Sequence, residues 1–399
     1  MLGIFAAALV MALFVPVAVQ AHQERVLYSF AGGQSDGAFT QAGVYVDAQR
    51  NLYGTTQAGG GTGCGGSGCG TVYKLTPHGK ETVLHIFGEG SDGWLPVGGV
   101  TMDSAGNLYG TTFFGGTSGR GTIFKVTPAG KESVLFSFSG GDDGSRPVAD
   151  LISDDAGNLY GTTTGGGSAG SGAVFEFTTD GKEKVLYSFL GGTDGFYPAA
   201  GLLRDAAGNL YGTTATGGID CDGSGQGCGT VFKLSPDGSE TVLYAFEGGS
   251  HGANPAAPVI MDETGALYGT TNNGGMVCDD SGATCGTVFK LTANGKETGL
   301  HIFAGGSDGS YPKGGLAMDA LGSLYGTTSS GGAGGGECGC GIIFKIRRNG
   351  AERIVHTFTG SDGSSPFTGL SMDTSGNFYG TTFLGGTFGD GAVFKLRNR

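Results

Sequence analysis

The sequence predicts an all-β fold, a seven-bladed β-propeller with four antiparallel strands in each blade. Three observations predict it: 86 of the 399 residues are glycine, one motif of five residues recurs seven times, and the two ends of the chain carry complementary parts of the repeat. Glycine at this level, without the period of collagen, suits many short strands joined by tight turns, because glycine reaches positive φ at no steric cost. Since 38% of the residues are hydrophobic, the chain can also bury a core.

The N-terminus reads as an export signal. Residues 1–21 form an apolar stretch that ends in Val19-Gln20-Ala21, with small residues at the two positions that a signal peptidase reads. No Lys or Arg precedes the apolar stretch, so a misassigned start codon or a retained N-terminal anchor is the alternative. We expect a signal peptide at 1–21 and a single propeller domain at 22–399. No other segment has the ~20 apolar residues of a membrane span. The mature chain is expected to be secreted, periplasmic or at the cell surface. We also expect it to be a monomer.

The recurring motif is LYGTT, which marks the second strand, B, of each repeat. It occupies residues 52–56, 108–112, 159–163, 210–214, 267–271 and 324–328, and, as FYGTT, residues 378–382. Successive copies lie 51 to 57 residues apart. This period is near that of four-stranded blades and too long for leucine-rich or ankyrin repeats.

Three further strands accompany each copy. A short apolar segment that closes on Asp precedes LYGTT and is predicted as strand A, for example 43–47, and it is joined to strand B by a D-x-x-G-N hairpin such as 103–107. A variable glycine-rich loop leads to strand C with its own turn, as at 72–80, and then to strand D, as at 83–87. Their β-branched and aromatic residues, bounded by Gly, Pro and Asp, are typical of strands. We place the repeats near 42–87, 98–138, 149–189, 200–246, 257–303, 314–358 and 368–397, the last completed by 25–30.

The two chain ends predict how the ring closes. Residues 26–30 read as a lone strand D, whereas the last copy stops after its strand C at 393–396. Pairing these segments completes the seventh blade and leaves no long exposed edge. An open solenoid would need capping repeats with polar outer faces, which the sequence lacks. We therefore expect the N-terminal strand to close the last blade.

The order of these segments resembles the blade of propellers with NHL-type repeats, which implies that strand A lines the channel and strand D the rim. The fuller set, LYGTT, GTVFKLTPxGKE, VLYSF and GGSDGxYP, resembles the GloVer (Gloeo/Verruco) tandem repeat of bacterial choice-of-anchor proteins over residues 25–399. This resemblance implies an exported protein, often tethered by a C-terminal sorting segment, and brings no catalytic residues. Because the chain ends at Arg397-Asn398-Arg399 directly after strand C, we expect free secretion.

All eight cysteines lie in the loops between strands B and C, as one pair in each of four blades. In an exported protein this grouping predicts local disulfides. Zinc is the rival, but it would require loops from different blades to converge on one ion. The expected pairs are Cys64/Cys69, Cys221/Cys228, Cys278/Cys285 and Cys338/Cys340. The last pair closes a very small ring, which is expected to strain the bond.

The B–C loops and the D–A connections between blades are expected to emerge on one face of the ring. The D–A connections present Asp-Gly in six of seven blades, at Asp36, Asp92, Asp143, Asp194, Asp308 and Asp362. A carboxylate ring for cations or sugars is one interpretation, but Asp before Gly is also the chemistry of a tight turn, which we favour for a residue repeated in nearly every blade. Aromatic residues near these turns can stack on sugar rings, and Trp94, Phe196, Tyr197 and Tyr311 are candidates for this role. Differences between copies are better candidates than shared residues, which favours Trp94, Phe113, Phe114, Phe383 and Phe388.

Calcium is the one cofactor the sequence leaves open. Asp220 and Asp222 resemble the opening of a calcium loop, and Asp279 and Asp280 offer further oxygen ligands, but the closing bidentate Glu is missing. The alternative is solvated loop carboxylates that hold no metal.

Other repeated residues are predicted to be architectural. His85, His301 and His356 share one repeat position with Tyr and Phe in other copies and are expected to pack as aromatic-sized residues, not to act as ligands. The glycine of LYGTT, such as Gly54, is expected to mark close approach of a neighbouring blade. Threonines at the end of this strand are ordinary β chemistry.

The charge and motifs narrow the function. A net charge of −13 disfavours nucleic acid as a partner. The leading hypothesis is a non-catalytic binding or scaffold propeller that presents a variable loop face to an extracellular glycan or protein. The alternatives are a propeller hydrolase or lyase with an acidic or calcium site at the channel mouth, and a structural envelope protein. No Ser-His-Asp order, HExxH or P-loop supports an enzyme, and no catalytic residue is predicted.

Overall fold

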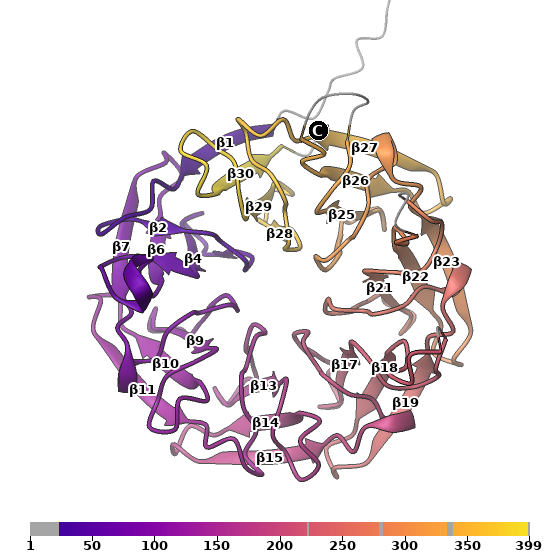
Figure 1. Cartoon of the computed structure of the whole chain (residues 1–399), viewed down its shortest axis with the longest axis horizontal. Helices are drawn as coiled ribbons and strands as arrows, with labels where there is room; N and C mark the ends of the chain where they lie inside the picture. The colour runs from indigo at the N-terminus through magenta and orange to yellow at the C-terminus, as the bar shows by residue number, and fades with distance from the viewer. Residues whose placement is uncertain (1–23, 222, 279–281, 333–337, 398–399) are drawn as a thin grey trace, which may run out of the picture.

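The computed structural model describes residues 24–221, 223–278, 282–332 and 338–397, so the predicted signal peptide lies outside the described residues. The described chain forms seven four-stranded antiparallel sheets around a central channel (Figure 1), which confirms the predicted fold class. Each sheet runs from strand A at the channel to strand D at the rim. Among the described residues, no helix has the length and apolar character that crossing a membrane requires.

The blades follow one another along the chain. Blade 1 contains β3 (Tyr45–Val46), β4 (Leu52–Thr56), β6 (Thr71–Leu75) and β7 (Glu81–Ile86). Blade 2 contains β8 (Thr101–Met102), β9 (Leu108–Thr112), β10 (Thr122–Val126) and β11 (Glu132–Ser137). Blade 3 contains β12 (Ile152–Ser153), β13 (Leu159–Thr163), β14 (Ala173–Phe177) and β15 (Glu183–Ser188). Blade 4 contains β16 (Leu203–Arg204), β17 (Leu210–Thr214), β18 (Thr230–Leu234) and β19 (Glu240–Ala245).

The remaining blades repeat the pattern. Blade 5 contains β20 (Ile260–Met261), β21 (Leu267–Thr271), β22 (Thr287–Leu291) and β23 (Glu297–Ile302). Blade 6 contains β24 (Ala317–Met318), β25 (Leu324–Thr328), β26 (Ile342–Ile346) and β27 (Glu352–Thr357). Blade 7 contains β28 (Ser371–Met372), β29 (Phe378–Thr382), β30 (Ala392–Leu396) and β1 (Glu24–Ser29). Outside the blades lie the short pair β2 (Gly37–Ala38) and β5 (Ala58–Gly59) and the 3-10 turns η1 (Cys64–Gly66), η2 (Gly90–Asp92), η3 (Gly192–Asp194), η4 (Gly249–His251) and η5 (Gly306–Asp308).

Strand B matches the LYGTT motif in every blade, but strands A and D differ from the prediction. The first strand A was expected over 43–47, and β3 has only two residues. The residues just before strand A bond to the neighbouring blade instead, as where Thr55 Oγ1 donates to the Gly98 carbonyl at 2.8 Å. Strand D begins two residues early, because Glu81 and Thr82 pair with the end of β6.

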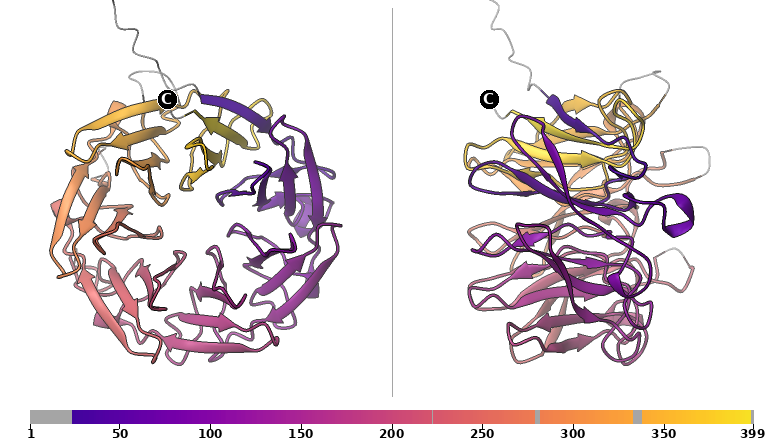
Figure 2. Two further views of the ribbon diagram at one scale, coloured as in Figure 1. Left: turned by 180° about the vertical axis from the view of Figure 1, so that it is seen from behind. Right: turned by 90° about the vertical axis from the view of Figure 1, so that its left-hand side faces the viewer.

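The ring closes as predicted. The N-terminal strand β1 pairs antiparallel with β30, from Glu24 opposite Leu396 to Ser29 opposite Ala392. The two ends of the described chain therefore meet in blade 7 at the rim (Figure 2, left). The side view of Figure 2 shows the loop that contains η1 projecting from one face of the ring.

The core lies between adjacent sheets. At every blade junction a buried Phe that follows strand D packs edge to face on a buried aromatic of strand C in the next blade, with ring centroids 5.0 to 5.2 Å apart. The pairs are Phe30–Tyr73, Phe87–Phe124, Phe138–Phe175, Phe189–Phe232, Phe246–Phe289, Phe303–Phe344 and Phe358–Phe394. The LYGTT glycine makes room for the same strand C ring, since a Cβ on Gly54 would lie 2.5 Å from the Tyr73 hydroxyl. The expectation of a close neighbouring blade at Gly54 was therefore wrong, because the close ring belongs to its own blade.

Candidate functional site

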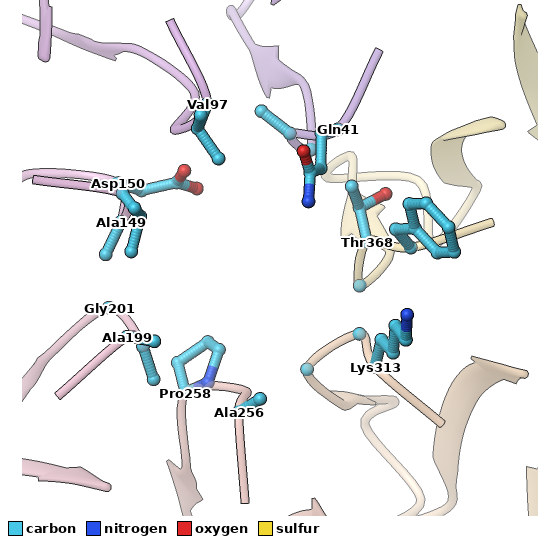
Figure 3. Close-up of a pocket in the computed structure, with 18 of the residues that line it drawn as sticks. Gln41, Val97, Ala149, Asp150, Ala199, Gly201, Ala256, Pro258, Lys313 and Thr368 are labelled. Carbon is cyan, nitrogen blue, oxygen red and sulfur yellow. The ribbon is translucent and has the colours of Figure 1, made fainter. Parts of the chain in front are cut away.

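A cavity of about 510 Å³ lies at the mouth of the central channel (Figure 3). It is lined by the segments that lead from the D–A connections into strand A, and all seven blades contribute to it. The lining includes side chains of the connections themselves, such as Tyr197, so the cavity belongs to the face that carries the D–A connections. The site is thus a property of the whole ring.

Two positions of the repeat form its wall, and both vary among the blades. The position after the conserved turn holds Gln41, Val97, Val148, Ala199, Ala256, Lys313 and Phe367. The position two residues further holds Gly43, Gly99, Asp150, Gly201, Pro258, Gly315 and Gly369. Five blades thus have glycine where blade 3 has a carboxylate. Among the described residues that line the cavity, Asp150 is the one acidic group and Lys313 the one basic group.

Asp150 is oriented by the neighbouring blade. Its Oδ1 accepts a hydrogen bond from the Gly99 N–H at 2.5 Å. The side chain is exposed to the channel, but the ring encloses it, and this burial raises the pKa of Asp150 against the opposing effect of the Gly99 hydrogen bond. The carboxylate is thus both reachable from the channel and held in one orientation.

The hydrogen bonds that join neighbouring blades at the channel are irregular next to blade 3, which carries Asp150. In six junctions the first Thr of LYGTT donates to a carbonyl of the next blade's channel segment at 2.8 to 3.2 Å. The pairs are Thr55–Gly98, Thr162–Ala200, Thr213–Ala257, Thr270–Gly314, Thr327–Thr368 and Thr381–Ala42. At the junction that precedes Asp150, Thr111 Oγ1 is buried and has no hydrogen-bond partner within the described chain. The blade that has Asp150 in place of glycine is therefore also the one at which the threonine hydrogen bond to the channel segment is missing from the described contacts.

Lys313 lies across the cavity from Asp150 (Figure 3). Its Nζ lies 4.4 Å from the centroid of the Phe367 ring, a cation–π contact. Burial lowers the pKa of Lys313. Phe367 packs on Phe383 at 5.1 Å between centroids, and Phe383 on Phe39 at 5.3 Å. An aromatic cluster thus adjoins the basic side of the cavity.

Strained residues hold the mouth of the channel in place. One position of the D–A connection has positive φ, between 54° and 63°, in every blade. Its residues are Phe39, Leu95, Arg146, Tyr197, Asn254, Tyr311 and Ser365. The Tyr197 N–H donates to the Ser171 carbonyl of the preceding blade, and its own carbonyl accepts from the Ala215 N–H. Such strain, about 1–3 kcal/mol per residue, persists only where surrounding contacts enforce it, so these side chains are displayed from rigid positions.

Four disulfides reinforce the same contacts. The predicted pairs Cys64–Cys69, Cys221–Cys228, Cys278–Cys285 and Cys338–Cys340 are all formed, with Cα atoms 5.0 to 5.9 Å apart. The second cysteine of each pair is buried. Its carbonyl accepts the strained residue's N–H from the next blade, as with Cys69 and Leu95 at 3.0 Å. The disulfides therefore fix the loops that position the channel mouth.

The Asp-Gly residues make turn contacts. Each of the six carboxylates accepts a hydrogen bond at 2.6 to 2.8 Å from a backbone N–H three to five residues earlier. The pairs are Asp36 with Ala31, Asp92 with Gly88, Asp143 with Ser139, Asp194 with Leu190, Asp308 with Ala304 and Asp362 with Thr359. These contacts support the turn interpretation over a carboxylate ring at the channel.

The predicted aromatic candidates separate into groups. Trp94 stacks on Phe114 with centroids 4.5 Å apart, Phe113 packs against Phe114, and the Arg146 guanidinium lies over both phenyl rings. This group contributes no side chain to the cavity lining.

The other aromatic candidates lie nearer the cavity or stand alone. Tyr197 lines the cavity and Phe383 contacts it through Phe367, whereas Phe196 is an exposed neighbour of Tyr197. Phe388 is 62% exposed, and Tyr311 is partly buried away from the lining.

Sequence reasoning missed Asp150, Lys313, Gln41 and Phe367. Their signal was present, because each differs from the other copies at its repeat position. Asp150 begins the apolar segment 150–154 that precedes LYGTT in blade 3 and so belongs to a predicted strand A, whereas the predicted binding residues were all aromatic. Comparing every repeat position across the seven blades would have found all four.

The calcium candidates stay untested. Asp222, Asp279 and Asp280 lie outside the described residues. Asp220 accepts hydrogen bonds from the Gly223 and Gly225 N–H groups at 3.0 and 3.2 Å, the pattern of a loop turn.

Comparison with known proteins gives a family and a fold. A model of the Gloeobacter/Verrucomicrobia repeat matches residues 65–277 and 218–399. No curated protein matches the sequence. The solved extracellular domain of a putative one-component system from B. thetaiotaomicron has a TM-score of 0.57 at 10% identity. That match covers 94% of this chain but 40% of that one, so this chain spans about two fifths of its length.

Two enzymes of known structure are more distant. A gluconolactonase from Xanthomonas campestris has a TM-score of 0.42 at 15% identity, covering 76% of this chain and 85% of that one. A luciferin-regenerating enzyme has a TM-score of 0.44 at 16% identity, covering 91% and 92%. Neither likeness is close enough to bear on function.

Proposed function

The chain belongs to the Gloeobacter/Verrucomicrobia repeat family, and from that premise we propose that it is an exported, non-catalytic binding propeller that takes a glycan at the mouth of its central channel. The observation that carries the proposal is Asp150, a carboxylate facing the cavity where five other blades have glycine. A repeated scaffold has no structural need for such an exception. A ligand-binding role explains why blade 3 has a carboxylate where five blades have glycine and blade 5 has proline.

The chemistry of the cavity supports a sugar. Its volume of about 510 Å³ lies within the range of small-molecule sites. Asp150, Gln41 and Lys313 offer an acceptor, an amide and a donor from different walls, which suits a ligand with several hydroxyl groups. The adjoining rings of Phe367 and Phe383 suit the apolar face of a sugar ring. We expect the other exposed aromatic residues of this face to extend contacts along a longer glycan.

Binding is better supported than catalysis. Glycoside hydrolysis uses a pair of carboxylates, and Asp150 is the one carboxylate among the described lining residues. Calcium takes six to eight oxygen ligands, far more than this side chain supplies.

Export is supported by three features. The N-terminal stretch has the pattern of a signal peptide. Four disulfides persist only where the environment is oxidising. The structural neighbour from B. thetaiotaomicron is an extracellular domain.

A thermal-shift screen tests this function. Residues 22–399 are heated with a panel of neutral, acidic and amino-sugar oligosaccharides, with calcium and with EDTA. The proposal predicts a rise of several degrees in Tm with one sugar class, because a ligand that binds the native state at 100 times its Kd stabilises it by about 2.7 kcal/mol. A shift with calcium alone would favour the enzyme, and no shift with any sugar would favour the structural role.

A further inference from the structure

The rim of the ring carries a second repeated feature. Strand D begins with a glutamate in every blade, at Glu24, Glu81, Glu132, Glu183, Glu240, Glu297 and Glu352. The Oε1 atom of each is buried without a hydrogen-bond partner within the described chain. Each glutamate lies beside the D–A turn that enters its own blade, as Glu132 lies beside Asp92. Every blade junction therefore brings a carboxylate with one unsatisfied oxygen beside a turn residue.

At two junctions a histidine completes a triad. One triad consists of His85, Asp92 and Glu132, and the other of His356, Asp362 and Glu24. Each residue offers one potential ligand atom, and within each triad these atoms lie within 4.8 Å of one another. His85 Nε2 lies 3.5 Å from Asp92 Oδ2, and it is buried without a hydrogen-bond partner in the described chain.

The second triad is more tightly paired. His356 Nε2 lies 3.0 Å from Asp362 Oδ2. Its glutamate, Glu24, stands on the closing strand β1. The histidines also pack edge to face on the strand D phenylalanines, as expected, so their rings are held in place.

Among the described residues, the carboxylates of these triads have no ion-pair partner except the histidine. Each contains two carboxylates, and the ion pairs of the described residues bring no Lys or Arg to either group. Partly buried carboxylates with unsatisfied oxygens are costly unless they are paired or bind a metal. One imidazole nitrogen with two carboxylate oxygens is a ligand set that suits Zn²⁺ and related divalent metals.

We propose that the triads His85–Asp92–Glu132 and His356–Asp362–Glu24 each bind a divalent transition-metal ion such as zinc at the rim of the ring. The first ion links β7 and η2 to β11 of the next blade. The second links β27 and the turn after it to β1, the strand that closes the ring. Metal binding thus fastens the closure between the two ends of the chain.

The other junctions are internal controls. At the His301–Asp308–Glu352 junction the His301 Nε2 lies 3.1 and 3.2 Å from the two Asp308 oxygens, much as in the His356–Asp362 pair, but Glu352 does not join them in a group whose ligand atoms all lie within 4.8 Å of one another. Other blades have an aromatic residue without a ring nitrogen at the histidine position, namely Tyr28, Phe136, Tyr187 and Tyr244. The fold therefore accepts tyrosine there.

Isothermal titration with ZnCl₂ tests the proposal on untagged residues 22–399 first stripped with EDTA. We expect two ions per chain, with one lost in His85→Tyr, one lost in His356→Tyr, and both retained in His301→Tyr. Glu132→Gln should weaken the first site at least tenfold while leaving the fold intact by circular dichroism. Zinc should also raise Tm of the wild type and not of the His85→Tyr/His356→Tyr double variant. Zinc binding that survives in the double variant, or no binding at 100 µM zinc, would overturn the proposal.

Discussion

Gly212, the third residue of LYGTT in blade 4, has no room for a side chain. A Cβ there would lie 2.6 Å from the tip of the Phe232 ring, which is fully buried. We predict that Gly212→Ala lowers the free energy of unfolding by about 1–3 kcal/mol, because an added methyl group in a packed core forces its neighbours to shift. Urea unfolding measures the change.

Gly299 is the matched control. It lies in strand β23, where a Cβ would meet only the Ser250 carbonyl at 3.6 Å, and other blades have Val or Ile at this position. Gly299→Ala should leave stability unchanged or raise it slightly. Equal losses at both positions would show that the Phe232 contact does not set the cost.

The candidate site shows what sequence could and could not predict at the residue scale. Tyr197 was identified because it lies beside an Asp-Gly turn of the loop face, and Phe383 because it differs from most other copies on that face. Asp150 was missed because its role depends on facing a channel that seven distant segments enclose. Its carboxylate is directed by a hydrogen bond from Gly99, 51 positions earlier in the chain, which no local pattern reveals.

At the scale of elements, the glutamate at the start of strand D makes stability depend on pH. Burial, aided by the nearby Asp143, raises the pKa of Glu183 to about 7, and burial with Asp194 does the same for Glu240. These groups therefore bind more protons in the folded than in the unfolded chain between pH 4.5 and 7. The free energy of unfolding should fall as pH rises through this window.

Glu183→Gln isolates this contribution, because the amide resembles the protonated acid. We expect it to raise the free energy of unfolding at pH 8, by less than about 1 kcal/mol since the site is partly solvated, and to change it little at pH 5. Denaturant titrations at the two pH values give the comparison. A loss of stability that is larger at pH 8 would mean that the ionised carboxylate has a favourable partner.

Strands B and C were predicted well because their bounds follow from local chemistry. In every LYGTT copy the Tyr hydroxyl donates to the Asp that closes strand A, as Tyr109 does to Asp103 at 3.0 Å. Strand A could not be bounded from sequence, because its first residues bond to other blades instead of to strand B. The length of that strand is decided by the ring and not by its own residues.

At the scale of the whole molecule, the ring depends on β1. This strand covers the edge of β30 and places Phe30 on Tyr73 of blade 1. Removing residues 1–30 exposes that strand edge. It also deletes the buried Phe30, and the loss of such a ring alone lowers the free energy of unfolding by about 3–5 kcal/mol.

We expect this truncated protein to unfold at least 10 °C lower than residues 22–399, or to aggregate, when both are followed by scanning calorimetry. Seven blades and their closure were predictable because the repeat and the chain ends are both visible in the sequence. Retention of the same cooperative transition without β1 would show that the seam is not essential.

The central claim is that Asp150 makes the channel mouth a binding site, and one titration tests it most directly. The sugar that gives the largest thermal shift is titrated calorimetrically into wild type, Asp150→Gly and Pro258→Gly, both substitutions restoring the residue found in five other blades at that position. We predict that Asp150→Gly weakens binding at least tenfold with Tm of the free protein unchanged, whereas Pro258→Gly binds within about twofold of wild type. Equal affinity of Asp150→Gly and wild type would contradict the assignment of the site.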